Sequence, residues 1–340
     1  MRMKLVLSIA CAVGLALGAE VKGTPERINV HGKSLEGNLS GDSVDRSVSV
    51  YLPPSYIKDK RRRYPVVYFL HGFTDSDEKW FWNEKHWINL PKVLDEAMAA
   101  GAVEAIVVMP NAFTKFQGSM YSNSAATGDW ESFVARELVA YVDSHYRTMA
   151  RRESRGLAGH SMGGYGTTRI GMKNPDVFSS MYMMNPCCMS PGFGGSRGAL
   201  SLEHVKTAED VAKLGFGEKA ALAGAAAWSP NPKNPPLFLD LPGPGQPDVQ
   251  ARWTANAPLA MVDQYITAFK RMTAIGFDAG DKEATISRDA RVLHEKLDAY
   301  GVAHDFEIYD GNHTNRVAER IKKKVMPFFT KHLDAGKRRR

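Results

Sequence analysis

Short predicted strands, several of them nearly continuous in apolar residues, alternate along this chain with segments of helical periodicity. Arg46–Leu52 alternates with period two, as in an outer strand, and the further strands are expected at Tyr64–Leu70, Val103–Met109, Ser154–Ala158, Phe178–Met184, Met272–Phe277 and Asp305–Tyr309. The segments with apolar residues three and four apart lie at Leu90–Ala100, Trp130–Tyr146, Tyr165–Met172, Arg288–Tyr300 and Arg316–Leu333. Strands buried on both faces are apolar throughout, and parallel strands need helical crossovers. The alternation therefore predicts an α/β fold with a mostly parallel central sheet and helices on both faces.

Residues 187–260 interrupt this alternation. They contain the run GFGGSRG, an alanine-rich piece and a Pro/Gly-rich stretch from Asn231 to Pro247. A long segment without strand pattern between two predicted strands is typical of a functional insertion. We expect one domain over residues 46–334 with an irregular insertion at 187–260 that forms a pocket wall. An N-terminal extension at 20–45 and a basic tail at 335–340 flank this domain.

The first nineteen residues have the order of a secretory signal peptide. Positive charge at Arg2 and Lys4 precedes the apolar run from Leu5 to Leu17, and small residues follow. This run is too short to span a bilayer, which takes about 20 apolar residues. The sequence predicts a secreted or periplasmic protein that does not insert into a membrane.

Three cysteines are too few for a disulfide framework. Removal of residues 1–19 takes away Cys11 and leaves the neighbours Cys187 and Cys188. Adjacent cysteines form a bridge only with strain, because their Cα atoms are closer than disulfide geometry prefers. We expect both to pack as small apolar side chains after a strand.

The charge balance indicates no nucleic-acid partner. Lys and Arg number 44 against 37 Asp and Glu, a formal net charge of +7, and much of the excess lies in two short runs at 61–63 and 337–340. Such runs are usually solvated faces or tails. The chain also lacks an H-E-x-x-H motif, zinc-site cysteine spacing, a complete P-loop and a dinucleotide fingerprint. No metal and no organic cofactor is expected, and the sequence leaves the oligomeric state open.

The pentapeptide Gly159-His160-Ser161-Met162-Gly163 is the sharpest local motif. A predicted strand precedes it and a predicted helix follows it. This G-x-S-x-G context forces the serine into a strained turn that exposes its hydroxyl. We therefore predict Ser161 as a nucleophile.

A serine hydroxyl needs a base in contact with it to be nucleophilic at neutral pH. His313 lies in the polar turn after the last predicted strand, which is where the base of an α/β-hydrolase lies, after the serine and the acid in chain order. An acid that orients the imidazole should follow the preceding strand. Asp278, Asp281 and Glu283 all lie there, and their spacing does not choose among them.

Two backbone amides are also required, because the tetrahedral intermediate carries an oxyanion. The residue after the nucleophile, Met162, supplies one amide. The turn after the strand Tyr64–Leu70 contains Gly72, and we expect the amide of Phe73 to be the second donor.

These residues resemble the esterase D family, which includes feruloyl esterase domains, S-formylglutathione hydrolases, enterochelin-type esterases and mycolyltransferases. The resemblance covers roughly residues 45–333. It depends on FLHGF, WESFVARELVAYVDSHYRT and LAGHSMGGYGT, and on the closing segment from FDAGDKE to DGNHTNR. It implies an α/β-hydrolase fold and a secreted serine carboxylesterase that hydrolyses carboxylic esters, with feruloyl or acetyl esters of carbohydrates as fitting substrates.

The family places its acid in a G-x-x-D pattern, which implies Glu283 here, a Glu where Asp is usual, with Asp281 as the alternative. Trp80, Trp82, His160 and Trp228 are candidates for substrate binding, although the tryptophans would equally serve as packing. Two other functions stay open: acyl transfer to a sugar acceptor, as in mycolyltransferases, and non-catalytic carbohydrate binding on the same scaffold.

Overall fold

The computed structural model describes residues 22–191 and 205–336. The predicted signal peptide and most of the basic tail therefore lie outside the described residues. Within those two ranges, no helix is long and apolar enough to cross a membrane.

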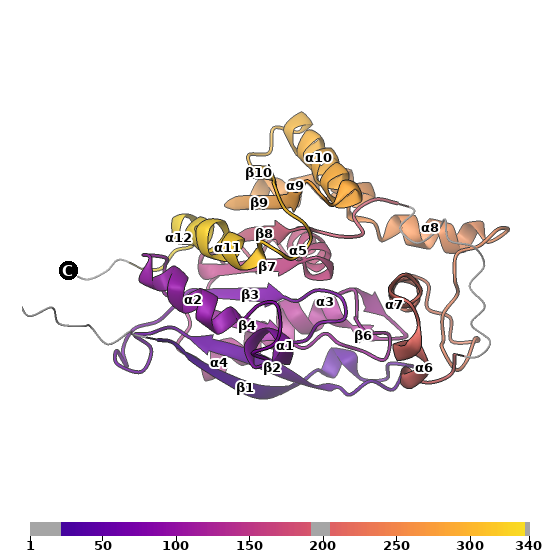
Figure 1. The fold of residues 1–340 in the computed structure, drawn as a ribbon, viewed down its shortest axis with the longest axis horizontal. Coiled ribbons are helices and arrows are strands. Elements are labelled where there is room, and N and C mark those ends of the chain that lie inside the picture. The colour runs from indigo at the N-terminus through magenta and orange to yellow at the C-terminus, as the bar shows by residue number, and fades with distance from the viewer. Residues whose placement is uncertain (1–21, 192–204, 337–340) are drawn as a thin grey trace, which may run out of the picture.

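An eight-stranded sheet forms the centre of the molecule, in the order β1-β2-β4-β3-β7-β8-β9-β10 (Figure 1). Its strands are β1 Thr24–His31, β2 Asp45–Leu52, β3 Val66–Leu70, β4 Ile106–Pro110, β7 Arg155–His160, β8 Ser180–Met184, β9 Ala274–Gly280 and β10 Asp305–Tyr309. A small separate ribbon pairs β5 Asn123–Ser124 with β6 Gly128–Asp129. The pairs β1–β2 and β2–β4 are antiparallel, and the other pairs of the large sheet are parallel. The predicted mostly parallel sheet is confirmed.

Strand β1 lies inside the segment 20–45 that the sequence suggested was an extension. It pairs with β2 along its whole length. Only Val30 of this strand is buried. A strand with so little buried surface leaves no apolar run, which is why the pattern did not reveal it.

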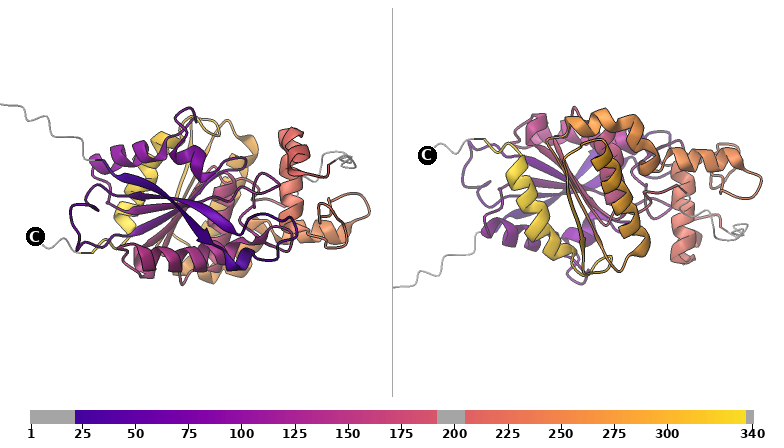
Figure 2. Two further views of the ribbon diagram at one scale, coloured as in Figure 1. Left: turned by 90° about the horizontal axis from the view of Figure 1, so that it is seen from below. Right: turned by 90° about the horizontal axis from the view of Figure 1, so that it is seen from above.

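Helices cover both faces of the sheet (Figure 2). The helices of the described residues are α1 Asp77–Phe81, α2 Leu90–Ala99, α3 Trp130–Ser132, α4 Leu138–His145, α5 Met162–Lys173, α6 Ala208–Lys213, α7 Phe216–Trp228, α8 Pro247–Ala255, α9 Pro258–Arg271, α10 Ala284–Ala299, α11 Val317–Arg320 and α12 Met326–His332. One apolar cluster joins the sheet to α4, α5, α9 and α10, and the other joins it to α1, α2 and α12. π-helical turns at Phe133–Glu137 and Ile321–Val325 link α3 to α4 and α11 to α12.

Strand β3 shows why several of the predicted strands are apolar throughout. Val66, Tyr68 and Leu70 face the first cluster, whereas Val67 and Phe69 face the second. Successive side chains of a strand point to opposite faces, so a strand covered on both sides buries all of them. Each face of the sheet thus packs against its own layer of helices.

The insertion is more helical than the sequence suggested. Its described part contains α6, α7 and α8, which lie together at one end of the molecule (Figure 1). Alanines occupy much of α7, and they are buried on more than one side of the helix, so the helix has no single apolar face. A helix of this kind gives little amphipathic signal.

Candidate active site

Ser161 lies at a sharp turn between β7 and α5. Its backbone has φ 59° and ψ −116°, a strained region for a residue with a side chain. A Cβ on Gly159 would lie 2.2 Å from the carbonyl oxygen of Gly163, and a Cβ on Gly163 would lie 1.9 Å from that of Leu70. The two flanking glycines are therefore required by close backbone contact, and the predicted strand–serine–helix turn is present.

His313 meets Ser161 from the other end of the chain. It lies in the loop after β10, and its Nε2 atom is 2.8 Å from Ser161 Oγ. The carbonyl of His313 accepts hydrogen bonds from His160 Nε2 at 2.7 Å and from Asn185 Nδ2 at 3.2 Å. Two side chains next to the nucleophile turn thus fix the loop that carries His313.

Asn185 is a site residue that the sequence did not indicate. Besides the carbonyl of His313, its side-chain amide donates to Tyr309 Oη at 2.7 Å and accepts from the Gly280 amide at 2.8 Å. It follows β8 with φ 42°. Asn is among the residues that adopt this left-handed conformation most readily. It ties the ends of β8, β9 and β10 together, and its isolated position in the sequence carries no motif.

Of the three acidic candidates, Glu283 is the one that faces His313. Glu283 Oε2 lies 3.7 Å from His313 Nδ1. This is beyond hydrogen-bond distance, and among the described residues His313 Nδ1 has no other partner. Catalytic hydrogen bonds are often long without substrate.

Asp281 and Asp278 have other partners. Asp281 Oδ1 accepts the amide of Gly311 at 3.0 Å, which shapes the loop before His313. Asp278 is fully buried and accepts from Tyr182 Oη at 2.9 Å and Arg320 Nη2 at 2.7 Å. These contacts give both carboxylates a structural role.

Burial sets the protonation of the two histidines at the site. It lowers the pKa of His313, while the negative charge of Glu283 opposes that shift. Burial also lowers the pKa of His160 to about 3, and the neighbouring His313 adds to this effect. His160 is therefore neutral and donates its Nε2 proton to the His313 carbonyl. It is only 2% exposed and supports the loop, and its contact with substrate stays a prediction.

The turn after β3 brings the predicted oxyanion donor beside the nucleophile. A Cβ on Gly72 would lie 3.4 Å from Ser161 Cβ. His71 anchors this turn, because its Nδ1 donates to the Gly72 carbonyl at 2.9 Å and its Nε2 accepts the Ala112 amide at 2.9 Å. Neither the Phe73 amide nor the Met162 amide has an acceptor among the described residues. Both are free to donate to an oxyanion.

Two of the tryptophans that the sequence offered for substrate binding or packing, Trp80 and Trp228, are buried. Trp80 is fully buried and donates from Nε1 to Asp75 at 2.9 Å. Trp228 is 5% exposed and packs edge-on against Trp253. Both contribute to packing rather than to a solvent-facing wall.

Trp82 and Trp87, which follow Trp80 closely in the sequence, are exposed. Trp82 is 43% exposed and donates to Ser49 Oγ at 3.0 Å. Trp87 is 40% exposed and packs edge-on against His160, with ring centroids 5.5 Å apart. Of Trp80, Trp82 and Trp87, it is therefore Trp87 that presents an exposed ring in contact with His160, the residue next to the nucleophile.

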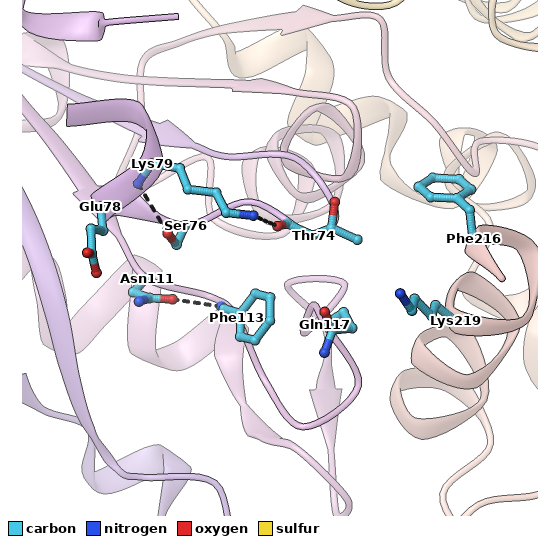
Figure 3. Close-up of a pocket in the computed structure, with 9 residues that line it drawn as sticks. All are labelled: Thr74, Ser76, Glu78, Lys79, Asn111, Phe113, Gln117, Phe216 and Lys219. Carbon is cyan, nitrogen blue, oxygen red and sulfur yellow. Dashed lines mark hydrogen bonds between the residues drawn. The ribbon is translucent and has the colours of Figure 1, made fainter. Parts of the chain in front are cut away.

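A hollow of about 540 Å³, lined by polar and apolar groups, opens beside the turn after β3 (Figure 3). Its lining residues are Thr74, Ser76, Glu78, Lys79, Asn111, Phe113, Gln117, Phe216 and Lys219. The Thr74 amide donates to the Gln117 carbonyl at 3.0 Å, and Lys79 Nζ donates to the Thr74 carbonyl at 2.6 Å. Phe216, at the start of α7, packs edge-on against Phe73. The insertion therefore supplies one side of this hollow, next to the predicted oxyanion donor.

One group of described residues has the composition of a metal site. His294, Asp298 and His304 bring one ligand atom each within 4.8 Å of one another. His294 Nδ1 and His304 Nε2 already share a hydrogen bond of 2.8 Å. Neither histidine contacts the Ser161–His313 pair.

Several known proteins are similar to this chain in sequence. Residues 43–317 match the model of a family described as putative esterase. An esterase of Mycobacterium tuberculosis is 25% identical over 279 residues, covering 79% of this chain and 52% of the relative. An endo-1,4-beta-xylanase/feruloyl esterase of Xylanibacter ruminicola is 33% identical over 157 residues, covering 44% of this chain and 21% of the relative. The chain spans about half the length, or less, of these curated relatives.

Solved structures share the fold. A ferulic acid esterase superposes with a TM-score of 0.65 at 20% identity, covering 92% of this chain and all of that one. An S-formylglutathione hydrolase from Agrobacterium tumefaciens superposes with a TM-score of 0.60 at 16% identity, covering 92% and 97% of the two chains. At these identities the likeness establishes the fold, including the predicted α/β-hydrolase architecture.

Proposed function

We propose, from the premise that this chain belongs to the putative esterase family, that it is a serine carboxylesterase acting through an acyl-enzyme. The observation that carries the proposal is the 2.8 Å contact between His313 Nε2 and the hydroxyl of a serine held in a strained turn. A neutral imidazole at this distance can take the hydroxyl proton as the oxygen attacks a carbonyl carbon.

In this mechanism the proton moves between three groups. Ser161 Oγ attacks the ester carbonyl, and His313 accepts its proton and passes it to the departing alcohol. Glu283 orients the imidazole and stabilises the imidazolium. The Phe73 and Met162 amides donate to the oxyanion of the tetrahedral intermediate. Water, activated by His313, then releases the acid.

The substrate we propose is a small-molecule or carbohydrate-linked ester, such as an acetyl or feruloyl ester of a sugar. The hollow beside Phe73 supports this assignment, since amide, hydroxyl and ammonium groups line it together with two phenylalanine rings. Pockets for such ligands combine apolar walls with a few polar groups that fix orientation. Two similar proteins, an endo-1,4-beta-xylanase/feruloyl esterase and a ferulic acid esterase, support the same assignment.

Export of the protein is part of the same proposal. Residues 1–19 carry the charged, apolar and small-residue order of a signal peptide. Expression in a secreting host should yield a mature chain that begins near Glu20. An exported chain that retained Met1 would contradict it.

The direct test of the nucleophile is covalent labelling. A fluorophosphonate probe should attach to the peptide that contains Ser161, and the label should be lost in Ser161→Ala. A panel of acetyl, butyryl, feruloyl and long-chain esters then ranks the acyl groups by kcat/KM. Labelling at another residue, or no turnover of any ester by the unlabelled protein, would contradict the proposal.

A further inference from the structure

Two neighbouring thiols lie directly behind the nucleophile turn. Cys187 and Cys188 follow β8, and their Sγ atoms are 2.6 Å apart. Both are free cysteines. Non-bonded heavy atoms normally settle at about 3.5–4.0 Å, whereas a disulfide is about 2.0 Å long. The two sulfur atoms are thus already much closer than ordinary packing brings side chains.

The loop that carries these thiols is bonded to the nucleophile turn. The Cys187 amide donates to the carbonyl of Ser161 at 3.2 Å, and the Ser161 amide donates to the carbonyl of Met184 at 3.0 Å. A Cβ on Gly164 would lie 2.9 Å from Pro186 Cα, so the loop and the start of α5 are in close contact. A change in the backbone at Cys187 therefore reaches Ser161 through one hydrogen bond.

The backbone of the loop is unusual in a way that suits a bridge between neighbours. Adjacent Cα atoms are about 3.8 Å apart, less than the roughly 4.4 Å that ordinary disulfides need. A bridge between neighbours therefore requires an uncommon local conformation. Cys188 has φ 59°, in the left-handed region that residues with side chains seldom adopt. Such conformations concentrate at functional sites.

We propose that Cys187 and Cys188 form a modification site: a low-molecular-weight disulfide such as oxidised glutathione converts them to a reversible bridge. Cys187 is partly exposed and Cys188 is buried, so Cys187 reacts first. Its thiolate attacks one sulfur of the small disulfide, forms a mixed disulfide and releases one small thiolate. Cys188 then loses its proton to solvent and attacks the sulfur of Cys187, which releases the second small thiolate.

The step balances in atoms and electrons. The protein loses two protons and two electrons, the sulfur–sulfur bond forms between its own thiols, and the small disulfide is reduced to two thiols. Burial raises the pKa of the Cys188 thiol, which fits its role as the second, resolving thiol, deprotonated only while it reacts. The modification needs no esterase activity.

Mass spectrometry tests the bridge on the whole protein. After oxidised glutathione, the tryptic peptide that spans residues 174–197 should be lighter by about 2 Da, and dithiothreitol should restore its mass. Cys11 lies in another tryptic peptide, so the assignment is unambiguous. Cys188→Ser should instead keep one glutathione on Cys187. A stable glutathione adduct on the wild-type peptide, or unmodified thiols, would overturn the proposal.

A kinetic comparison tests the connection to the nucleophile, and this part rests on the proposed function. Because the Cys187 amide binds the Ser161 carbonyl, bridged and reduced protein should differ in kcat for an acetyl ester by at least about twofold. The same treatments should leave the kcat of Cys187→Ser unchanged, because that variant lacks the thiol that reacts first. Equal kcat values in the two wild-type forms would overturn the connection. A chain that hydrolyses no ester would still show the mass change, so the two failures are distinguishable.

Discussion

The nucleophile turn and the insertion differ in how tightly their residues are held. Around Ser161, glycines touch backbone atoms of other elements, and the strands that lead to the turn are buried on both faces. The insertion places Phe216 69% exposed beside Phe73, and a Cβ on its Gly215 would meet only a Glu218 carboxylate oxygen at 3.2 Å. On the proposed function, we expect the sheet to hold the nucleophile in place and the insertion to influence which ester is accepted.

Removal of the nucleophile should give the largest effect. Ser161→Ala deletes the attacking oxygen, and kcat for an acetyl ester should fall by up to about a million-fold. The residual rate would come from the oxyanion donors and substrate binding. Steady-state kinetics of protein freed from host esterases measures it. A loss of less than about tenfold would mean that the turn does not carry the reaction.

Two neighbouring carboxylates should respond differently. Glu283→Gln removes the charge that faces His313, so kcat should fall by up to about ten-thousand-fold. Asp281→Asn weakens a hydrogen bond to the Gly311 amide and should mainly lower the melting temperature. Kinetics and thermal unfolding of both variants separate the roles. A larger loss of kcat in Asp281→Asn would transfer the orienting role to Asp281.

A pair of glycine variants compares the two regions directly. In Gly163→Ala the added Cβ would overlap the Leu70 carbonyl, so the free energy of unfolding should fall by about 3 kcal/mol or more. In Gly215→Ala, at the N-cap of α7, the methyl group would displace only the end of the flexible Glu218 side chain, so the change should cost less than about 1 kcal/mol. Urea unfolding measures both. Equal losses would show that the insertion is as tightly constrained as the turn.

The acid limb of the pH profile should report the burial of His313. Burial lowers its pKa, so the imidazole stays neutral and active below its ordinary range of about 6.5. The rate should fall only as the pH drops through that lowered pKa. Glu283→Gln removes the charge that opposes this shift and should move the limb to still lower pH. Profiles of kcat/KM between pH 4 and 8 check the direction, and a limb that moves upward would contradict it.

The smallest effect should come from the insertion itself. Phe216→Ala removes an exposed ring from the hollow, so the ratio of kcat/KM for feruloyl to acetyl esters should fall by roughly three- to tenfold. Lys213→Ala, on α6 outside the hollow, is the matched control and should leave the ratio unchanged. An unchanged ratio in Phe216→Ala would exclude the hollow from substrate contact.

The sequence predicted the central strands well because a strand buried on both faces leaves an unbroken apolar run. It predicted the serine turn because strand, serine and glycines are adjacent in the chain. It failed at β1, whose side chains are mostly exposed, and at α7, whose alanines give no amphipathic face. It also could not distinguish Trp80, which is buried against Asp75, from Trp87, which is exposed beside His160. The local sequence gives neither tryptophan a pattern that predicts how exposed its side chain is.

By itself, the sequence determined the alternating strands and helices and the glycines at the nucleophile turn, since these depend on contacts between residues close in the chain. Only the tertiary structure decided which carboxylate faces His313, that Asn185 and His160 hold the loop of that histidine, and that the insertion reaches Phe73. These contacts join residues far apart in the chain. Their geometry depends on how the sheet twists and where the loops close, which no local pattern records.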